Sequence, residues 1–70
     1  MTPTRIDEQP WFANDAPLDG AVITGRATLE YANGGRIYGL VVRRPDGSRA
    51  VLYFDRRALT FSTAELPANP

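Results

Sequence analysis

The sequence predicts an all-β protein, a small and strongly bent antiparallel meander or barrel of four to five strands that follows an irregular N-terminal leader. Residues rich in β-branched and aromatic side chains, which favour strands, fill three stretches at 21–32, 36–44 and 49–55. Two turn sequences join them, Asn-Gly-Gly at 33–35 and Pro-Asp-Gly-Ser at 45–48. Asn-Gly supplies the positive φ angles of a tight hairpin, and Pro-Asp-Gly favours a type I turn followed by a left-handed glycine.

Each stretch has its own hydrophobic pattern. Residues 21–32 alternate apolar and polar side chains, which is typical of a strand with one buried face, and Gly25 within it predicts a bulge or a sharp bend. Residues 36–44 are apolar on both faces, so we expect this strand to lie centrally. Residues 49–55 are also apolar on both faces through most of their length, and a short fourth strand is expected over 58–63.

Composition and length indicate how the chain is divided into segments. We expect an acidic, proline-containing leader at 1–20, a small β-barrel domain at 21–63 and a disordered tail at 64–70, since its prolines cannot continue a sheet. A chain of 70 residues forms one domain at most, and so small a core needs further stabilisation. The absence of cysteine excludes disulfides, so we expect a homo-oligomer.

Charges are segregated although the net charge is zero. Residues 1–20 carry a net charge of −3 and residues 21–59 a net charge of +4. This asymmetry indicates an anionic partner. The alternative is that the charges only form a solvated surface that keeps the protein soluble. No stretch approaches the roughly 18 apolar residues of a membrane span, and no apolar run follows the N-terminus, so we expect a cytoplasmic protein without membrane contact.

No catalytic constellation is visible. The chain has no histidine, cysteine or lysine, and the carboxylates of Glu30, Asp46 and Asp55 lie on different predicted elements. Without histidine and cysteine it also lacks the usual ligands of zinc, copper and iron. We therefore expect a binding module with no catalytic residue, no metal and no cofactor.

Antiparallel pairing brings arginines together at both ends of the predicted sheet. Arg36, Arg56 and Arg57 fall near the Asn-Gly turn, within reach of exposed aromatic rings that include Tyr31 and Tyr38. These five residues are the predicted nucleic-acid site, in which arginines contact phosphates and tyrosines stack on bases. The alternative is that the charges only protect strand ends from edge pairing.

A second group gathers at the Pro-Asp-Gly turn. It consists of Arg43, Arg44 and Arg49, with Asp46 as the only acid expected nearby. The leader carries the aromatic pair Trp11-Phe12, which either plugs one open end of the barrel or anchors a partner protein. The three arginines and the two aromatic residues are the predicted contacts to a protein partner.

Residues 29–41 resemble the first signature of the Sm and Sm-like RNA-binding family. In that signature a strand ends in Asn-Gly or Asp-Gly, four residues follow, and a second glycine opens the bend of the next strand; Gly34 and Gly39 match this spacing. A later segment is similar to that of the bacterial Sm-like RNA chaperones, where two basic or polar residues help to line the RNA-binding rim. Arg56 and Arg57 hold the matching positions.

Residues 28–41 and 51–54 also resemble the two aromatic RNA-binding strands of cold-shock domains, which implies that Tyr31, Tyr38 and Phe54 stack on unpaired bases. We therefore predict an Sm-like, SH3-like or reduced OB barrel that binds single-stranded RNA or another nucleic acid. The alternative is a protein-interaction module that regulates or inhibits a larger bacterial or phage complex. The aromatic, acidic leader and a pI near 6.1 favour this alternative.

Overall fold

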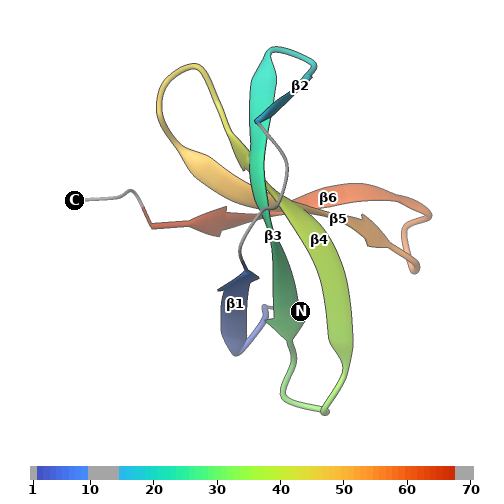
Figure 1. The fold of residues 1–70 in the computed structure, drawn as a ribbon. Coiled ribbons are helices and arrows are strands. Elements are labelled where there is room, and N and C mark those ends of the chain that lie inside the picture. Colours follow the sequence, from blue (N-terminus) through green and yellow to red (C-terminus); the bar gives the residue numbers. More distant parts are fainter. Residues whose placement is uncertain (1, 10–14, 68–70) are drawn as a thin grey trace.

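The computed structural model describes residues 2–9 and 15–67, and these form one antiparallel sheet of six strands without helices (Figure 1). The order across the sheet is β1-β3-β4-β5-β6, and β2 pairs with β3. The strands are β1 (Arg5–Gln9), β2 (Ala16–Leu18), β3 (Ala21–Glu30), β4 (Arg36–Arg43), β5 (Arg49–Asp55) and β6 (Thr60–Leu66). The all-β prediction is therefore confirmed, and no helix among the described residues is long and apolar enough to cross a membrane.

The leader is more regular than the sequence predicts. β1 pairs with residues 26–30 of β3, and β2 pairs with residues 21–23 of the same strand. The two short strands lie on the side of β3 that faces away from β4 and form an interrupted edge. The prediction of an irregular leader and of four to five strands was wrong, because an edge strand tolerates a proline such as Pro17 in β2.

The C-terminal strand also differs from its prediction. β6 begins two residues later than expected and runs on to Leu66, so residues 64–66 pair with residues 49–51 of β5. The expectation that the chain leaves the sheet after Thr63 was wrong, because Ala64 and Leu66 pack against the core. Pro67 follows the strand directly, where a residue without an N–H ends pairing.

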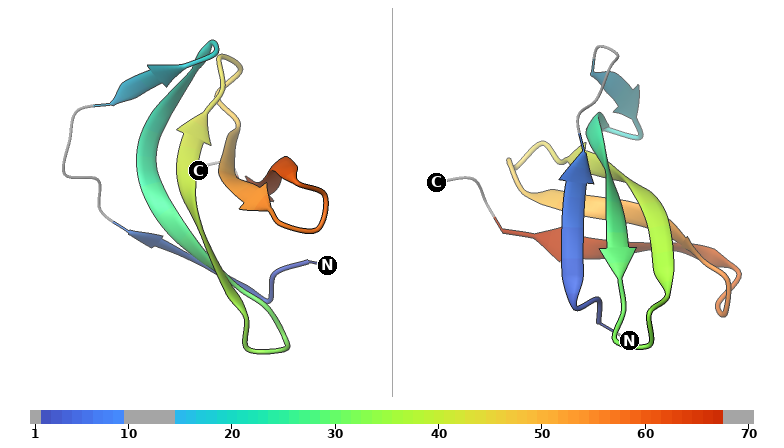
Figure 2. Two further views of the ribbon diagram at one scale, coloured as in Figure 1. Left: turned by 90° about the vertical axis from the view of Figure 1, so that its right-hand side faces the viewer. Right: turned by 60° about the horizontal axis from the view of Figure 1, so that its bottom comes forward.

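The central hairpins match their sequence signals closely. Gly34 and Gly47 have φ angles of 85° and 88°, as the two turn sequences require. β4 lies between β3 and β5, as its doubly apolar pattern predicts, and the β3–β4 register shifts between Ile23 and Gly25, which confirms the bulge. Beyond the bulge β3 curves strongly (Figure 2). The curved sheet encloses a core of buried residues on its inner face: Ala27, Leu29, Val41 and Val51.

The sheet is strongly bent but does not close, so of the two expected architectures the meander is confirmed and the closed barrel was wrong. The end strands β1 and β6 do not pair with each other. β4 pairs with β5 only over residues 40–43 and 49–52; the start of β4 then continues beside β3 alone and the end of β5 beside β6 alone. The β5–β6 hairpin therefore crosses β3 and β4 steeply (Figure 1).

Gly39 lies at the point where β4 and β5 separate. A Cβ atom at this position would lie 2.6 Å from the carbonyl oxygen of Leu52 and 2.6 Å from a methyl carbon of Val51. No side chain fits at these distances, so the crossing requires glycine. The separation of the strands opens the sheet on one side.

We predict that Gly39→Ala destabilises the fold by about 1–3 kcal/mol, because the added methyl group overpacks a contact with backbone atoms that cannot rotate away. Urea unfolding followed by circular dichroism measures the change. Gly25→Ala is the matched control, since its Cβ would meet its nearest atom, the Gln9 carbonyl oxygen, at an ordinary 3.5 Å. An equal loss in the two variants would contradict the role given to Gly39.

Candidate nucleic-acid interface

A groove of about 610 Å³ lies where β4 and β5 separate. Its walls come from the β3–β4 turn, the start of β4, the end of β5 and the β5–β6 turn. All five residues of the predicted nucleic-acid site line it: Tyr31, Arg36, Tyr38, Arg56 and Arg57. The convergence expected from antiparallel pairing is therefore present in the fold, whereas contact with nucleic acid stays a prediction.

Two of the groove arginines project from the turn between β5 and β6. The Asp55 carboxylate accepts hydrogen bonds from the backbone N–H groups of Arg57, at 2.9 Å, and Ala58, at 3.3 Å. These bonds hold the turn in place. Within residues 2–9 and 15–67, no carboxylate forms an ion pair with Arg56 or Arg57, and both residues are exposed. Their guanidinium groups are thus available to an anionic ligand.

Arg36 lies at the start of β4, opposite Glu30 of β3. Its Nε atom is 3.3 Å from the Glu30 carboxylate, and the Arg36 side chain is largely exposed. The Glu30 side chain is partly buried, whereas the exposed Arg36 guanidinium is open to a further anionic group such as a phosphate. Arg36 therefore adds a third cation to the groove.

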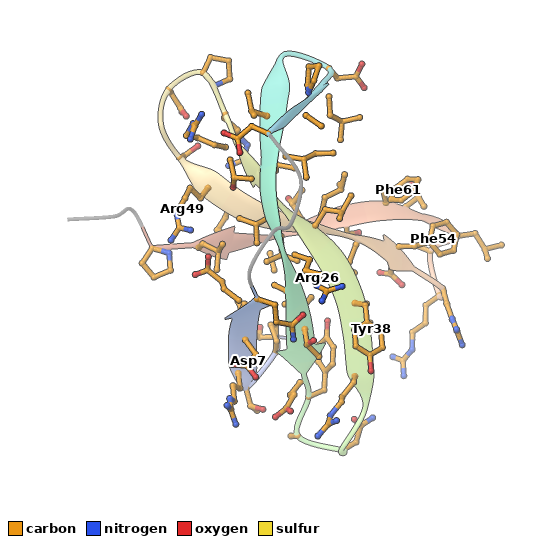
Figure 3. The ribbon with its side chains drawn as sticks, in the orientation of Figure 1. Asp7, Arg26, Tyr38, Arg49, Phe54 and Phe61 are labelled. Carbon is orange, nitrogen blue, oxygen red and sulfur yellow. The ribbon has the colours of Figure 1, made fainter. Side chains whose placement is uncertain are left out.

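Exposed aromatic rings stand on both sides of the opening. Tyr38 of β4 is 73% exposed and Phe54 of β5 is 45% exposed; Figure 3 shows them on the two diverging strands. Phe54 packs edge-to-face on Phe61 of β6, with ring centroids 5.4 Å apart. Phe61 is not among the site residues predicted from the sequence, although the pairing of the last two strands places it opposite Phe54.

Tyr31 differs from its prediction as an exposed ring. It is only partly exposed and packs against the core, which leaves Tyr38 as the open ring of the two predicted tyrosines. Burial raises the pKa of the Tyr31 hydroxyl, and the neighbouring Tyr53 hydroxyl and Asp55 carboxylate raise it further. Tyr31 therefore stays protonated at neutral pH and offers the groove a neutral hydroxyl group.

A second hollow, of about 560 Å³, is also lined by Tyr38. Gln9, Arg26 and Leu40 contribute to its walls. In Figure 3, Arg26 and Tyr38 lie on neighbouring strands, β3 and β4. Tyr38 therefore lines both hollows.

The second predicted arginine group is not a free basic surface. Each of its members lies beside a carboxylate, in the pairs Arg44–Glu65, Arg49–Glu8 and Arg43–Asp15, with shortest distances of 2.7, 2.8 and 3.9 Å. The expectation that Asp46 is the only nearby acid was wrong, because the paired leader strands and the longer β6 bring other acids to this end. The role of these arginines in binding a partner stays a prediction.

Hydrogen bonds lower the pKa of two carboxyl groups in this region. Arg44 holds Glu65 through two hydrogen bonds, of 2.7 and 2.8 Å, which lower the pKa of Glu65. The hydroxyl and backbone N–H of Ser48 donate to Asp46 and lower the pKa of that carboxyl. Trp11 and Phe12 lie outside the described residues, so neither the plug nor the anchor is tested.

Among the described residues, no group of three or more histidine, cysteine, aspartate or glutamate side chains could hold a metal ion. In comparisons with protein-family models, curated proteins and solved structures, nothing matched this chain. The resemblances to Sm-like proteins and cold-shock domains stay predictions that rest on the residues quoted for them.

We predict that stability falls as the pH is lowered through and below the ordinary range of carboxylates. The pKa of Glu65 is lower in the fold than in the unfolded chain, so its contribution is complete above the unfolded value and is lost as the pH falls through the folded value. Urea unfolding at a series of pH values measures this. Glu65→Gln and Arg44→Gln should each make the free energy of unfolding depend less steeply on pH in the acid range. The double variant should reduce this dependence no further. Unchanged slopes would contradict the prediction.

Proposed function

We propose that this protein is a non-enzymatic binding module for single-stranded nucleic acid, with RNA as its main ligand. The observation that supports the proposal is the groove between β4 and β5, which combines three arginines with exposed aromatic rings. Guanidinium groups bind phosphate oxygens through charge-assisted hydrogen bonds, and aromatic faces stack on unpaired bases of any sequence.

The low pI does not oppose this role, because the charges of the fold are unevenly placed. Three acids, Glu8, Asp15 and Glu65, lie beside arginines at the end of the sheet away from the groove. The Asp55 carboxylate in the groove accepts two backbone N–H groups. The groove is therefore more basic than the chain as a whole.

The preference for RNA rests on hydroxyl groups in the groove. Tyr31 and Tyr53 both line it and interact with each other through their hydroxyls. Such groups can donate to or accept from the 2′-hydroxyl that distinguishes RNA from DNA. This role agrees with the cytoplasmic location expected from the sequence.

A second candidate function is a protein-interaction module that regulates or inhibits a larger complex. It is favoured by the exposed apolar side chains of Phe54, Leu59 and Phe61 beside the groove. Capture of partners from a lysate with and without nuclease separates the two: partners lost with nuclease support the nucleic-acid role, and partners that persist support the protein role.

We predict salt-dependent binding of a fluorescently labelled oligouridylate, measured by anisotropy. Three arginine contacts to a single strand give a slope of log K against log salt of about −2. Arg57→Ala should weaken binding and make the slope shallower by about 0.7. Arg43→Ala, which removes an arginine at the opposite end of the sheet, is the matched control and should change neither value. Absence of binding at low salt would exclude the proposal.

We also predict that Tyr38→Ala weakens binding by about 1–3 kcal/mol, since the exposed ring would no longer stack on a base. Tyr38→Phe keeps the ring and should bind as the wild type does, because the aromatic face that stacks on a base is retained. The same anisotropy assay compares the three proteins. Equal weakening in both variants would show that the hydroxyl, and not the ring, contacts the ligand.

A further inference from the structure

β6 is an unpaired edge of the sheet. It pairs with β5 on one side, and no strand among residues 2–9 and 15–67 pairs with its other side. A free edge presents a row of backbone donors and acceptors that pairs readily with another strand unless charges, proline or short length prevent it. β6 is seven residues long, and Pro67 lies after it, not within it. Its one charged residue, Glu65, is held by Arg44.

The opposite edge is protected. β1 has only five residues, with the charged side chains of Arg5, Asp7 and Glu8, and β2 has only three, with Pro17 in the middle. Short length, charge and proline are the features that keep natural edge strands from pairing. The two edges of this sheet therefore differ, and β6 is the one suited to pair.

Large apolar side chains accompany this edge. Phe61 is 66% exposed, and Leu59, in the turn that leads into β6, is 76% exposed. Leu59 also has a φ angle of 54°, a left-handed conformation that a bulky side chain rarely adopts. Strained backbone is retained most often where it serves a contact. Exposure and strain at the same residue indicate that the turn and the edge form an interaction surface.

We propose that β6 pairs antiparallel with β6 of a second copy of this chain, around a two-fold axis at Thr63. This register pairs the full length of both strands, and a small, uncharged and exposed residue meets its own copy at the axis. The result is an isologous dimer with one continuous sheet across both copies.

Charge selects the antiparallel orientation. β6 starts beside the basic turn that carries Arg56 and Arg57. An antiparallel pair places the basic turns of the two copies at opposite ends of the joined strands, whereas a parallel pair would place them side by side. The net charge of zero leaves no long-range repulsion between copies. The shared sheet also supplies the additional stabilisation that so small a core needs.

Cysteine cross-linking and sedimentation test the dimer. The chain has no cysteine, so Thr63→Cys introduces a single thiol. Opposite residues of an antiparallel pair have Cα atoms about 4.5–5.5 Å apart, which is within the range of a disulfide. Under mild oxidation Thr63→Cys should form a covalent dimer about tenfold faster than Leu18→Cys, a control on β2, because thiols that face each other in a complex have a high effective concentration.

Sedimentation of the full chain should give twice the 7.7 kDa mass of one copy. Thr63→Arg places two like charges opposite each other and should therefore sediment as a monomer. Its circular dichroism spectrum should be that of the wild type. A wild-type monomer at all accessible concentrations would overturn the proposal. So would equal cross-linking of the two cysteine variants, or a dimer that persists in Thr63→Arg. None of these measurements depends on binding of nucleic acid.

Discussion

The close passage of Gly39 against β5 is the constraint on which the rest of the structure depends. With a hydrogen in place of a side chain, Gly39 lets β4 approach the Leu52 carbonyl and the Val51 side chain more closely than any other residue could. β4 and β5 then separate, so that the start of one and the end of the other each keep a single neighbour. The groove occupies the space between them, and its lining therefore includes rings such as Tyr31 and Tyr53 that also pack on the core.

A second ordering principle is the pairing of charges away from the groove. Arg49 is the most buried of these cations, with 16% of its side chain exposed, and it joins β5 to Glu8 of β1 at 2.8 Å and to the Pro67 carbonyl at 3.4 Å. Its Nε atom is buried without a hydrogen-bond partner among the described residues, so the contact carries a desolvation cost. The same contact joins β1 to β5 across the bent sheet. Of the groove arginines, Arg36 lies beside Glu30, whereas Arg56 and Arg57 form no ion pair within residues 2–9 and 15–67, and this contrast gives a chain of zero net charge a more basic end.

Local signals in the sequence were sufficient for the central part of the fold. The strands from Ala21 to Asp55, the two turns and the bulge at Gly25 follow from alternation and turn chemistry. The antiparallel order of the strands also predicts that Arg36, Arg56 and Arg57 fall at one end of the sheet, where they line the same groove. β1 was missed because its pairing with β3 joins residues about 20 positions apart, and nothing in the pattern of Arg5–Gln9 specifies a partner. The ion pairs at the opposite end were missed for the same reason. β2 is close in sequence to its partner residues and was missed because it contains Pro17. Partial burial of Tyr31 depends on how the sheet bends, which alternation does not encode.

The groove and the free edge of β6 have one physical origin, since both exist because the sheet bends without closing. A closed barrel would pair β6 with β1 and would leave no row of unpaired backbone groups beside Phe61. It would also bring the start of β4 beside the end of β5, where the ring of Tyr38 now stands apart from that of Phe54. With only six buried hydrophobic residues among those described, the chain keeps several large apolar side chains at its surface. These side chains lie where strands lack a neighbour. The open sheet that keeps the core small therefore also provides the surfaces for ligands and partners.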